Sequence, residues 1–209
     1  VRVLSEWVNK NNLVGKKIVE FACGEGEIGV VLSSMGCHYQ GYDIAPSAVA
    51  KASEKLSGYP NASVTLRDLV IEPIDEKFDA LLDVMGLHMM VTDSDRKAYL
   101  TNGYNCLKAD APFLFYRQSA KEDAYDGVID SIEQYVEILE CDYVTPGKRE
   151  VIQDGETIEV HIPLVPARAR NLEGYLKEFS DIGFHIDEIT DLAPNQAIYK
   201  SAAIYGHKE

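Results

Sequence analysis

Short apolar runs alternate with stretches of helical periodicity along most of the chain, beginning near residue 17. This alternation is typical of βαβ units, in which helices connect the parallel strands of one sheet. Pro46 and Ser47 suit the first turn of one connecting helix, and Asp93 with its neighbours suits the start of another. The pattern predicts five strands, over residues 17–22, 38–43, 62–67, 78–84 and 112–117.

After the fifth predicted strand the alternation stops, and residues 120–165 have the pattern of an insertion. Asp154 and Gly155 form a favoured two-residue turn between two strand-like runs, which predicts a hairpin. Before it, apolar residues recur at helical spacing and predict an amphipathic helix, at Val128, Ile129, Ile132, Tyr135, Val136 and Leu139.

The alternation returns after the insertion. A helix that ends at Gly183 is predicted, with an apolar face made of Leu172, Leu176, Phe179 and Ile182. Phe184, Ile186 and Ile189 indicate a sixth strand, and residues 197–205 a seventh, followed by a polar tail over 206–209. We therefore expect an α/β fold, a doubly wound, seven-stranded, mostly parallel sheet with helices on both faces. Residues 1–209 form one domain in this prediction, and residues 120–165 a helix-plus-hairpin cap inserted after strand five.

The charge balance narrows the choice of partners. The 209 residues contain 34 acidic and 20 basic side chains, a formal net charge of −14, and the basic residues form no cluster. Nucleic acids and anionic membranes are bound through concentrated positive charge, so neither is an expected partner. The four cysteines lack metal-ligand spacing, and no apolar run approaches the length of a membrane span. A cytoplasmic protein is the expectation.

A glycine-rich turn follows the first predicted strand. Gly24, Gly26 and Gly29 form a GxGxxG sequence, which lets a ligand approach the backbone at a helix N-terminus. Asp43 lies 19 residues after Gly24, at a spacing suited to binding ribose hydroxyls. Either a nicotinamide dinucleotide or another adenosine-containing cofactor fits this arrangement. Glu20 favours a cationic cofactor such as S-adenosylmethionine, because its negative charge would repel a pyrophosphate.

The order of these motifs resembles that of the class I S-adenosylmethionine-dependent methyltransferases, over about residues 14–118 and 172–206. Residues 20–26 resemble the first motif of that family, with Ala22 in place of its first glycine. In the family this loop wraps the methionine part of the cofactor. The resemblance therefore implies cofactor contacts from Glu20, Ala22, Cys23, Gly24, Glu25 and Gly26, although Glu25 is also explained as a solvated loop charge.

Further motifs agree with this resemblance. Asp43 matches the family's ribose-binding acid, and Ile44 the residue against the adenine face. Asp68, followed by Leu69, matches the acid that contacts the adenine amino group. Residues 78–88 resemble the fourth-strand motif, and its Asp83 is implied in contact with the cofactor or the substrate. Residues 107–111 depart from the family's usual Leu-Lys-Pro-Gly-Gly turn before strand five.

The resemblance implies an in-line methyl transfer, in which the protein aligns the acceptor and excludes water. His88 is the candidate base for an acceptor that must lose a proton, and a packed structural histidine is the alternative. An acidic cluster for a catalytic metal is missing after strands four and five, so we expect no metal. The candidate substrate-binding residues are Met89, Tyr116, Arg117, Arg168 and Arg170. The last two either clamp a carboxylate or pair with the protein's own acids.

We therefore predict an S-adenosylmethionine-dependent methyltransferase that acts on a small-molecule acceptor and releases S-adenosylhomocysteine. The insertion, and any residues before Val1, are expected to recognise the acceptor. One alternative is an NAD(P)-dependent oxidoreductase that uses the same GxGxxG loop. Another is a catalytically inactive S-adenosylmethionine-binding protein. The expected assembly is a monomer or a homodimer.

Overall fold

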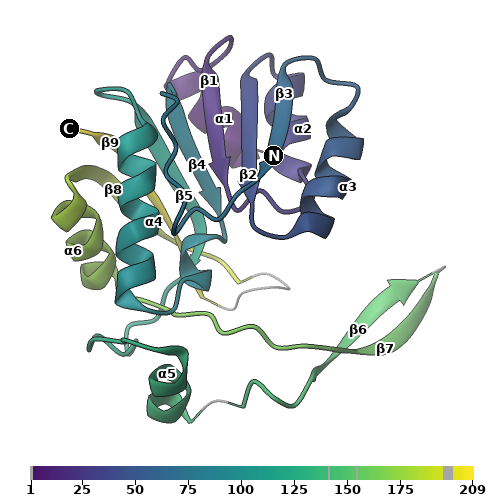
Figure 1. Cartoon of the computed structure of the whole chain (residues 1–209), viewed down its shortest axis with the longest axis vertical. Coiled ribbons are helices and arrows are strands. Elements are labelled where there is room, and N and C mark those ends of the chain that lie inside the picture. Colours follow the sequence, from purple (N-terminus) through teal and green to yellow (C-terminus); the bar gives the residue numbers. More distant parts are fainter. Residues whose placement is uncertain (1, 141, 154, 195–199) are drawn as a thin grey trace.

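A mixed sheet of seven strands forms the centre of the molecule (Figure 1). The computed structural model describes residues 2–140, 142–153, 155–194 and 200–209. The strands of the central sheet are β1 (Lys17–Phe21), β2 (His38–Asp43), β3 (Ala62–Leu66), β4 (Ala80–Val84), β5 (Pro112–Ser119), β8 (Phe184–Leu192) and β9 (Ser201–Lys208). Their order is β3-β2-β1-β4-β5-β9-β8; β9 runs antiparallel to both β5 and β8, and the other neighbouring strands are parallel. This arrangement confirms the predicted doubly wound α/β fold.

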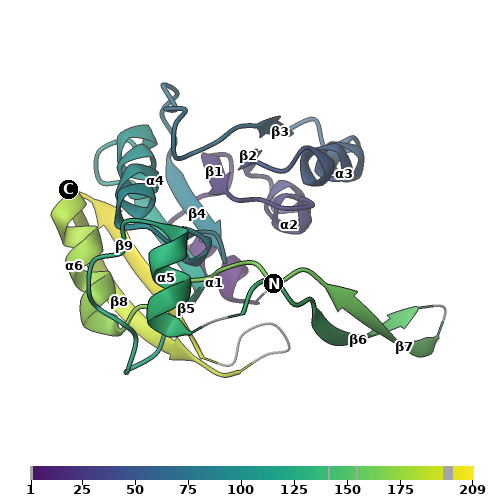
Figure 2. The same ribbon diagram turned by 60° about the horizontal axis from the view of Figure 1, so that its bottom comes forward.

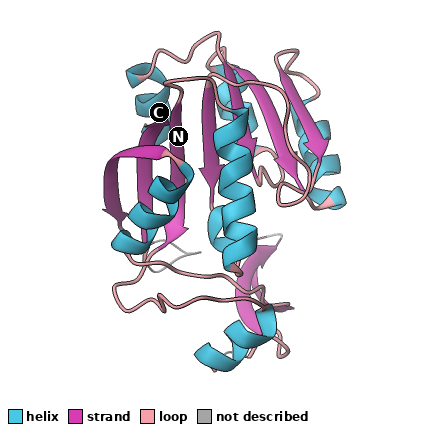
Figure 3. Cartoon of the chain, turned by 60° about the vertical axis from the view of Figure 1, so that its left-hand side comes forward, coloured by secondary structure: helices cyan, strands magenta, loops and turns pink. Residues whose placement is uncertain are grey.

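Helices cover both faces of this sheet (Figure 3). They are α1 (Arg2–Lys10), α2 (Glu27–Ser34), α3 (Pro46–Leu56), α4 (Asp93–Cys106) and α6 (Leu172–Ile182), with a short 3₁₀ helix, η1 (Leu87–Met89), after β4. α1, α2 and α3 pack on one face, where Trp7 and Leu32 belong to a buried cluster. α4 and α6 pack on the other face, against a second cluster rich in aromatic rings. Each face of the sheet thus has its own apolar core, as expected for parallel strands.

The first five strands lie where the hydrophobic pattern predicts them, but two details of this part of the chain differ from the prediction. The fourth begins at Ala80, because Phe78 makes only an isolated bridge to Leu107. We also expected a helix in every interval between strands, and this is wrong for the segment from 67 to 79. That segment contains turns and bends, and its backbone bonds instead to side chains such as Asn102, which accepts from the Ile74 N–H at 2.9 Å.

The insertion contains a helix, α5 (Ile132–Leu139), and a hairpin of β6 (Gly147–Gln153) and β7 (Glu156–Ile162). The predicted helix is shorter than expected, since Ser131 caps it by accepting a hydrogen bond from the Gln134 N–H. Val128 and Ile129 therefore precede the helix, although Ile129 is fully buried. Of the predicted turn, Gly155 has a φ of 85°, and Asp154 lies outside the described residues. Figures 1 and 2 show the hairpin projecting away from the sheet.

The late part of the chain requires two corrections. The buried face of α6 consists of Tyr175 and Phe179, whereas Leu172 and Leu176 are exposed. The last strand begins later within the described residues and continues to Lys208, so the predicted polar tail is wrong. The strand continues because it pairs with β8 as far as Lys208, whose ammonium group also donates to the carbonyls of Tyr104 and Leu107. Gly183 does end α6 in the left-handed conformation, with a φ of 108°.

A search of the helices in the described part of the chain finds none that is both long enough and apolar enough to cross a membrane.

The aromatic core between α6 and the sheet generates a prediction about stability. Phe179 is fully buried, and its ring centroid lies 4.9 Å from that of Phe115 and 5.4 Å from that of Phe113. We expect Phe179→Ala to lower the free energy of unfolding by about 3–5 kcal/mol, because it leaves a cavity. Leu176→Ala, in the same helix but 47% exposed, is the matched control and should change it by about 0.5 kcal/mol. Urea unfolding of both variants tests this, and equal losses would contradict the assigned helix face.

Candidate active site

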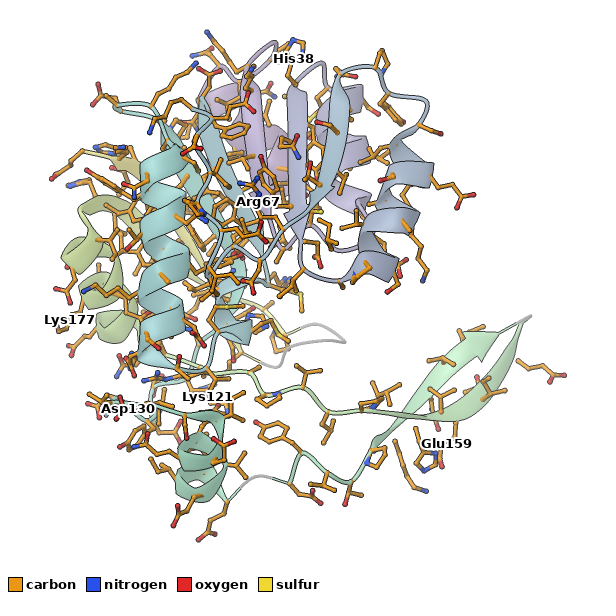
Figure 4. The ribbon with its side chains drawn as sticks, viewed as in Figure 1. His38, Arg67, Lys121, Asp130, Glu159 and Lys177 are labelled. Carbon is orange, nitrogen blue, oxygen red and sulfur yellow. The ribbon has the colours of Figure 1, made fainter. Side chains whose placement is uncertain are left out.

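The carboxyl ends of β1 to β4 meet at one edge of the sheet, where side chains crowd around the glycine-rich loop after β1 (Figure 4). Ala22, Gly24 and Gly26 have positive φ angles of 52°, 53° and 80°. Alanine is strained in this conformation by about 1 kcal/mol or more, yet the turn forms as predicted. A methyl group built on Gly24 would meet no atom within 4 Å. The loop therefore leaves open space against its backbone at Gly24.

Asp43, at the end of β2, fastens this loop. One carboxylate oxygen accepts from the Gly24 N–H at 2.8 Å, and the other accepts from the Ala45 N–H at 2.9 Å. The side chain is only half-buried, so its remaining lone pairs face outward. Ile44 follows it with 64% of its surface exposed. An acceptor for hydroxyl groups thus lies beside an uncovered apolar side chain.

Glu20 lies beneath the loop and is almost fully buried. Its carboxyl group accepts a hydrogen bond of 2.5 Å from the hydroxyl of Tyr39. The Tyr39 ring fits there because Gly29 and Gly41 leave no side chain in its way. Burial raises the pKa of Glu20 to about 8, although the bond from Tyr39 acts to lower it. The group is therefore largely protonated at neutral pH, and a nearby cation would favour its ionised form.

Asp83, at the end of β4, is fully buried, and this corrects the expectation of a direct contact with the cofactor or substrate. Its carboxylate accepts from the Gly86 N–H, the Tyr99 hydroxyl and the Gln118 amide, each at 2.7 Å. Burial raises the pKa of Asp83 to about 6, against these three hydrogen bonds. The side chain positions the loop after β4.

His88 lies in η1, directly after that loop, and is 4% exposed. Its backbone N–H donates to the Gln118 side chain at 3.1 Å, and its carbonyl accepts from the Arg168 N–H at 2.8 Å. The ring atom Nδ1 is buried and has no hydrogen-bond partner within the part of the chain that the structure describes. Burial lowers the pKa of His88 to about 4, so the ring is neutral at pH 7. Nδ1 of His88, which can accept or donate a hydrogen bond, thus lies close to the carboxyl end of β4.

The other residues predicted to contact the cofactor differ in accessibility. Asp68 is half-buried and accepts from the Val70 N–H at 2.9 Å. The side chain of Leu69 packs in the core instead of facing the edge, which corrects its predicted contact. Cys23 is also buried, so only its backbone belongs to the loop surface. Glu25 is exposed and pairs with Lys51 at 2.7 Å, which fits a solvated loop charge.

Arg168 and Arg170 are buried and pair with the protein's own acids, which is the second of the two roles that the sequence left open for them. Arg168 bonds to Asp93 at 2.8 Å, and Arg170 bonds to Asp93 at 2.9 Å and to Glu178 at 2.7 Å. Glu178 also accepts hydrogen bonds from Nε and Nη2 of Arg96, each at 2.8 Å. Burial alone would raise the pKa of Glu178, but the arginines outweigh it and lower that pKa. This ionic network joins the end of the insertion to α4 and α6.

The remaining predicted substrate residues surround the end of β5. Met89 is 37% exposed, and Tyr116 is half-buried. Arg117 has a φ of 62° within a β-bulge, and it donates to the Ala193 carbonyl at 2.7 Å. The bulge aims Arg117 along the edge instead of into the sheet.

Sequence reasoning missed several residues that build this edge. Tyr39, Tyr99 and Gln118 each bond to one of the buried acids, and Arg96 and Glu178 complete the ionic network. Their only sequence signal is a polar residue type inside an otherwise apolar pattern. The hydrogen-bond partner of each of these residues becomes known only from the folded structure.

The arrangement fits an adenosine-containing cofactor with a cationic end. The space against Gly24 admits a ligand to the loop backbone, Asp43 offers acceptors for ribose hydroxyls, and Ile44 offers an apolar surface for a base. Glu20 adds a group that a cation would stabilise in its charged form.

The buried Glu20 carboxyl group predicts a pH-dependent stability. Its pKa is about 8 in the folded state against an ordinary 4.5, so the folded state holds the proton more tightly. The wild type should therefore lose stability relative to Glu20→Gln as pH rises from about 4.5 to 8, by about 1.4 kcal/mol per pH unit. Urea unfolding at pH 5, 6.5 and 8 measures this difference. Glu25→Gln, at an exposed position, is the control, and a constant gap between wild type and Glu20→Gln would refute the assignment.

The ionic network predicts a large effect of Asp93. Asp93→Ala removes the acidic partner of Arg168 and one of the two partners of Arg170. We expect the free energy of unfolding to fall by about 3 kcal/mol, because buried charge is left uncompensated. Asp95→Ala removes another acid from the first turn of α4, outside the network, and should lower it by less than about 1 kcal/mol. Similar values for the two variants in thermal unfolding would count against the network.

Comparison with known proteins gives a consistent result. Residues 18–110 match a family model described as a methyltransferase domain. A ubiquinone biosynthesis O-methyltransferase from Pseudomonas fluorescens is 26% identical over 137 residues, which is 64% of this chain and 58% of that protein. The chain therefore spans less than two thirds of the length of this relative.

Solved structures share the whole fold at low sequence identity. An S-adenosylmethionine-dependent methyltransferase from Clostridium acetobutylicum has a TM-score of 0.69 and 15% identity, over 99% of this chain and 89% of that one. The glycopeptide N-methyltransferase MtfA in complex with S-adenosylmethionine has a TM-score of 0.66 and 16% identity, over 98% and 92% of the two chains. Residues 18–110 thus resemble a methyltransferase domain, and the chain as a whole shares its fold with these two methyltransferase structures.

Proposed function

We propose that this protein transfers the methyl group of S-adenosylmethionine to a small-molecule acceptor and releases S-adenosylhomocysteine. The observation that carries this proposal is the glycine loop fastened by Asp43, with open space against Gly24 and the buried Glu20 beneath it. Together these features offer hydrogen-bond acceptors to a ribose and a favourable environment to a cation. The resemblance of residues 18–110 to a methyltransferase domain supports the same cofactor.

When bound, S-adenosylmethionine supplies a methyl group that its sulfonium has already activated for displacement. The outward lone pairs of Asp43 would accept from the ribose hydroxyls, and Ile44 would cover one face of the adenine. Asp68, which is half-buried after β3, would accept from the adenine amino group. The backbone at Gly24 would lie along the methionine part. Glu20 would act through its charge, since its side chain is buried below the loop.

The acceptor would approach from the carboxyl edge, beyond which the insertion extends (Figures 1 and 2). We propose that residues 120–165 cap this approach within a single domain. Met89, Tyr116 and Arg117 would line it, because they lie at the ends of β4 and β5. A small molecule is favoured by the net charge of −14 and by the ubiquinone biosynthesis O-methyltransferase among the relatives. Cytoplasmic location and a monomeric or dimeric state stay predictions.

His88 is the candidate for a hydrogen bond to the acceptor. Its ring is neutral at pH 7, and Nδ1 has no hydrogen-bond partner among the described residues. Gln118 and Arg168 hold its backbone from two sides, which fixes the ring behind the edge. A lowered pKa weakens the ring as a base, so His88 would contribute mainly by orienting the acceptor through a hydrogen bond.

Binding experiments test the cofactor. We expect S-adenosylmethionine and S-adenosylhomocysteine to bind the wild type with micromolar affinity, and Asp43→Ala to weaken both at least 10-fold, because it removes the ribose acceptors and frees the loop. Isothermal titration calorimetry measures this, with Asp75→Ala, an exposed acid outside the site, as the control. Binding of NADH alone would identify an oxidoreductase instead. Binding of both adenosyl compounds without turnover of any acceptor would favour an inactive cofactor-binding protein.

The role of His88 has its own test in turnover. Phenols and amines are screened as acceptors, and the methylated product is detected by mass spectrometry. His88→Ala should lower kcat by about 10-fold or more with S-adenosylmethionine affinity unchanged, and His88→Gln should restore part of the loss by keeping a polar group. Since the neutral ring persists down to about pH 4, the wild-type rate should not fall through the pH 6–7 range on account of this group. A full rate in His88→Ala would show a structural histidine.

A further inference from the structure

A group of metal-ligand side chains lies on the last two strands of the sheet. Asp187 Oδ2 is 3.3 Å from His207 Nδ1, and Asp187 Oδ1 is 3.7 Å from His185 Nε2. Glu209 Oε1 is 3.2 Å from His185 Nδ1. Each of His185, Asp187 and His207 offers one ligand atom, and these three atoms all lie within 4.8 Å of one another.

The strand register produces this group. His185 of β8 lies directly opposite His207 of β9, and the two ring centroids are 4.7 Å apart. Alternate residues of a strand share a face, so Asp187 joins His185, and Glu209 joins His207. A shift in register between Ile186 and Glu188 marks a bulge at Asp187. The bulge leaves Asp187 free of a paired partner on β9 and turns it toward both histidines.

The group lies far from the candidate active site. His207 pairs with Pro112, the first residue of β5, at the edge of the sheet opposite to the glycine loop. In Figure 1 the chain end, beside His207, lies at the far end of the strands from the insertion. The side chains are half-exposed, with 50% of His185, 50% of Asp187 and 35% of His207 accessible. None of them belongs to the machinery described above.

The donor set matches the preferences of zinc. Zinc binds imidazole nitrogen and carboxylate oxygen at about 2.0–2.2 Å, so tetrahedral ligand atoms lie about 3.4 Å apart. The distance from Asp187 to His207 Nδ1 is already near this value, and the distance from Asp187 to His185 Nε2 needs only a small rotation of exposed side chains. Magnesium prefers an all-oxygen shell with several waters, which two imidazoles do not provide.

We propose that His185 Nε2, Asp187 and His207 Nδ1 bind a zinc ion, with a water molecule completing the tetrahedron and Glu209 orienting the His185 ring through its Nδ1. The site departs from the sequence-based expectation of no metal, since its residues come from two separate strands. The ion would replace the weak contacts between these side chains with bonds that join the edge strand β8 to β9. Because it would bind the folded chain only, it would raise the unfolding temperature. Its role is to stabilise the end of the fold, away from the reaction.

Zinc chloride titrated into metal-free protein tests this proposal, with isothermal titration calorimetry and thermal unfolding as readouts. All proteins carry Cys141→Ser, because a thiol also binds zinc. We expect one zinc ion per chain, a higher unfolding temperature with zinc, and no such rise with magnesium. His185→Asn and His207→Asn should each weaken zinc binding at least 10-fold. His161→Asn, an exposed histidine near Glu159 on the hairpin, is the matched control and should bind zinc as before.

Equal zinc binding in the His185→Asn and His207→Asn variants, or no binding in the parent, would overturn the proposal. Circular dichroism without zinc verifies that the variants are folded, and these exposed substitutions should leave the metal-free unfolding temperature nearly unchanged. Asp187→Asn provides a second route if a histidine variant fails to fold, and it should also weaken binding. Retained binding in Asp187→Asn would likewise contradict the site.

Discussion

The buried carboxyl group of Asp83 is the constraint on which the candidate active site depends. A carboxyl group removed from water is tolerated only when hydrogen bonds replace those it loses. Asp83 obtains them from the backbone of Gly86, from Tyr99 on α4 and from Gln118 on β5. These bonds fix the loop after β4 against two other elements, and they set the position of η1. Because η1 follows this loop directly, the bonds of Asp83 also determine where His88 lies.

The three acids at the carboxyl edge have different roles, which depend on how deeply each one is buried. Asp83 is fully enclosed and organises the backbone, and Glu20 is enclosed and accepts from one donor among the described residues, Tyr39. Asp43 is only half-buried, so it both fastens Gly24 and keeps lone pairs for a ligand. Negative charge close to an adenosine site favours a cationic cofactor over a pyrophosphate. The burial of these acids thereby makes the site selective for a cationic cofactor.

The sequence predicts the fold well wherever a repeating pattern reflects burial. The first five strands, the glycine loop and the hairpin follow from periodicity and turn residues that act locally. The start of α5 depends on a cap at Ser131, and the face of α6 on which side packs against the sheet, so neither follows from apolar spacing. Arg168 and Arg170 alternate as a substrate clamp would, but their partners, Asp93 and Glu178, are distant in sequence. Such partners are chosen by tertiary contacts, which one chain's pattern does not contain.

A crystal structure of the protein with S-adenosylhomocysteine would test the central claim most directly. We expect the carboxylate of Asp43 to accept hydrogen bonds from both ribose hydroxyls while it keeps its bond to the Gly24 N–H. We also expect the conformation of the loop to change little. Asp83 should stay bonded to its three donors and should not touch the ligand. A ligand bound elsewhere, or a rearranged loop with Asp83 in direct contact with the cofactor, would contradict the account.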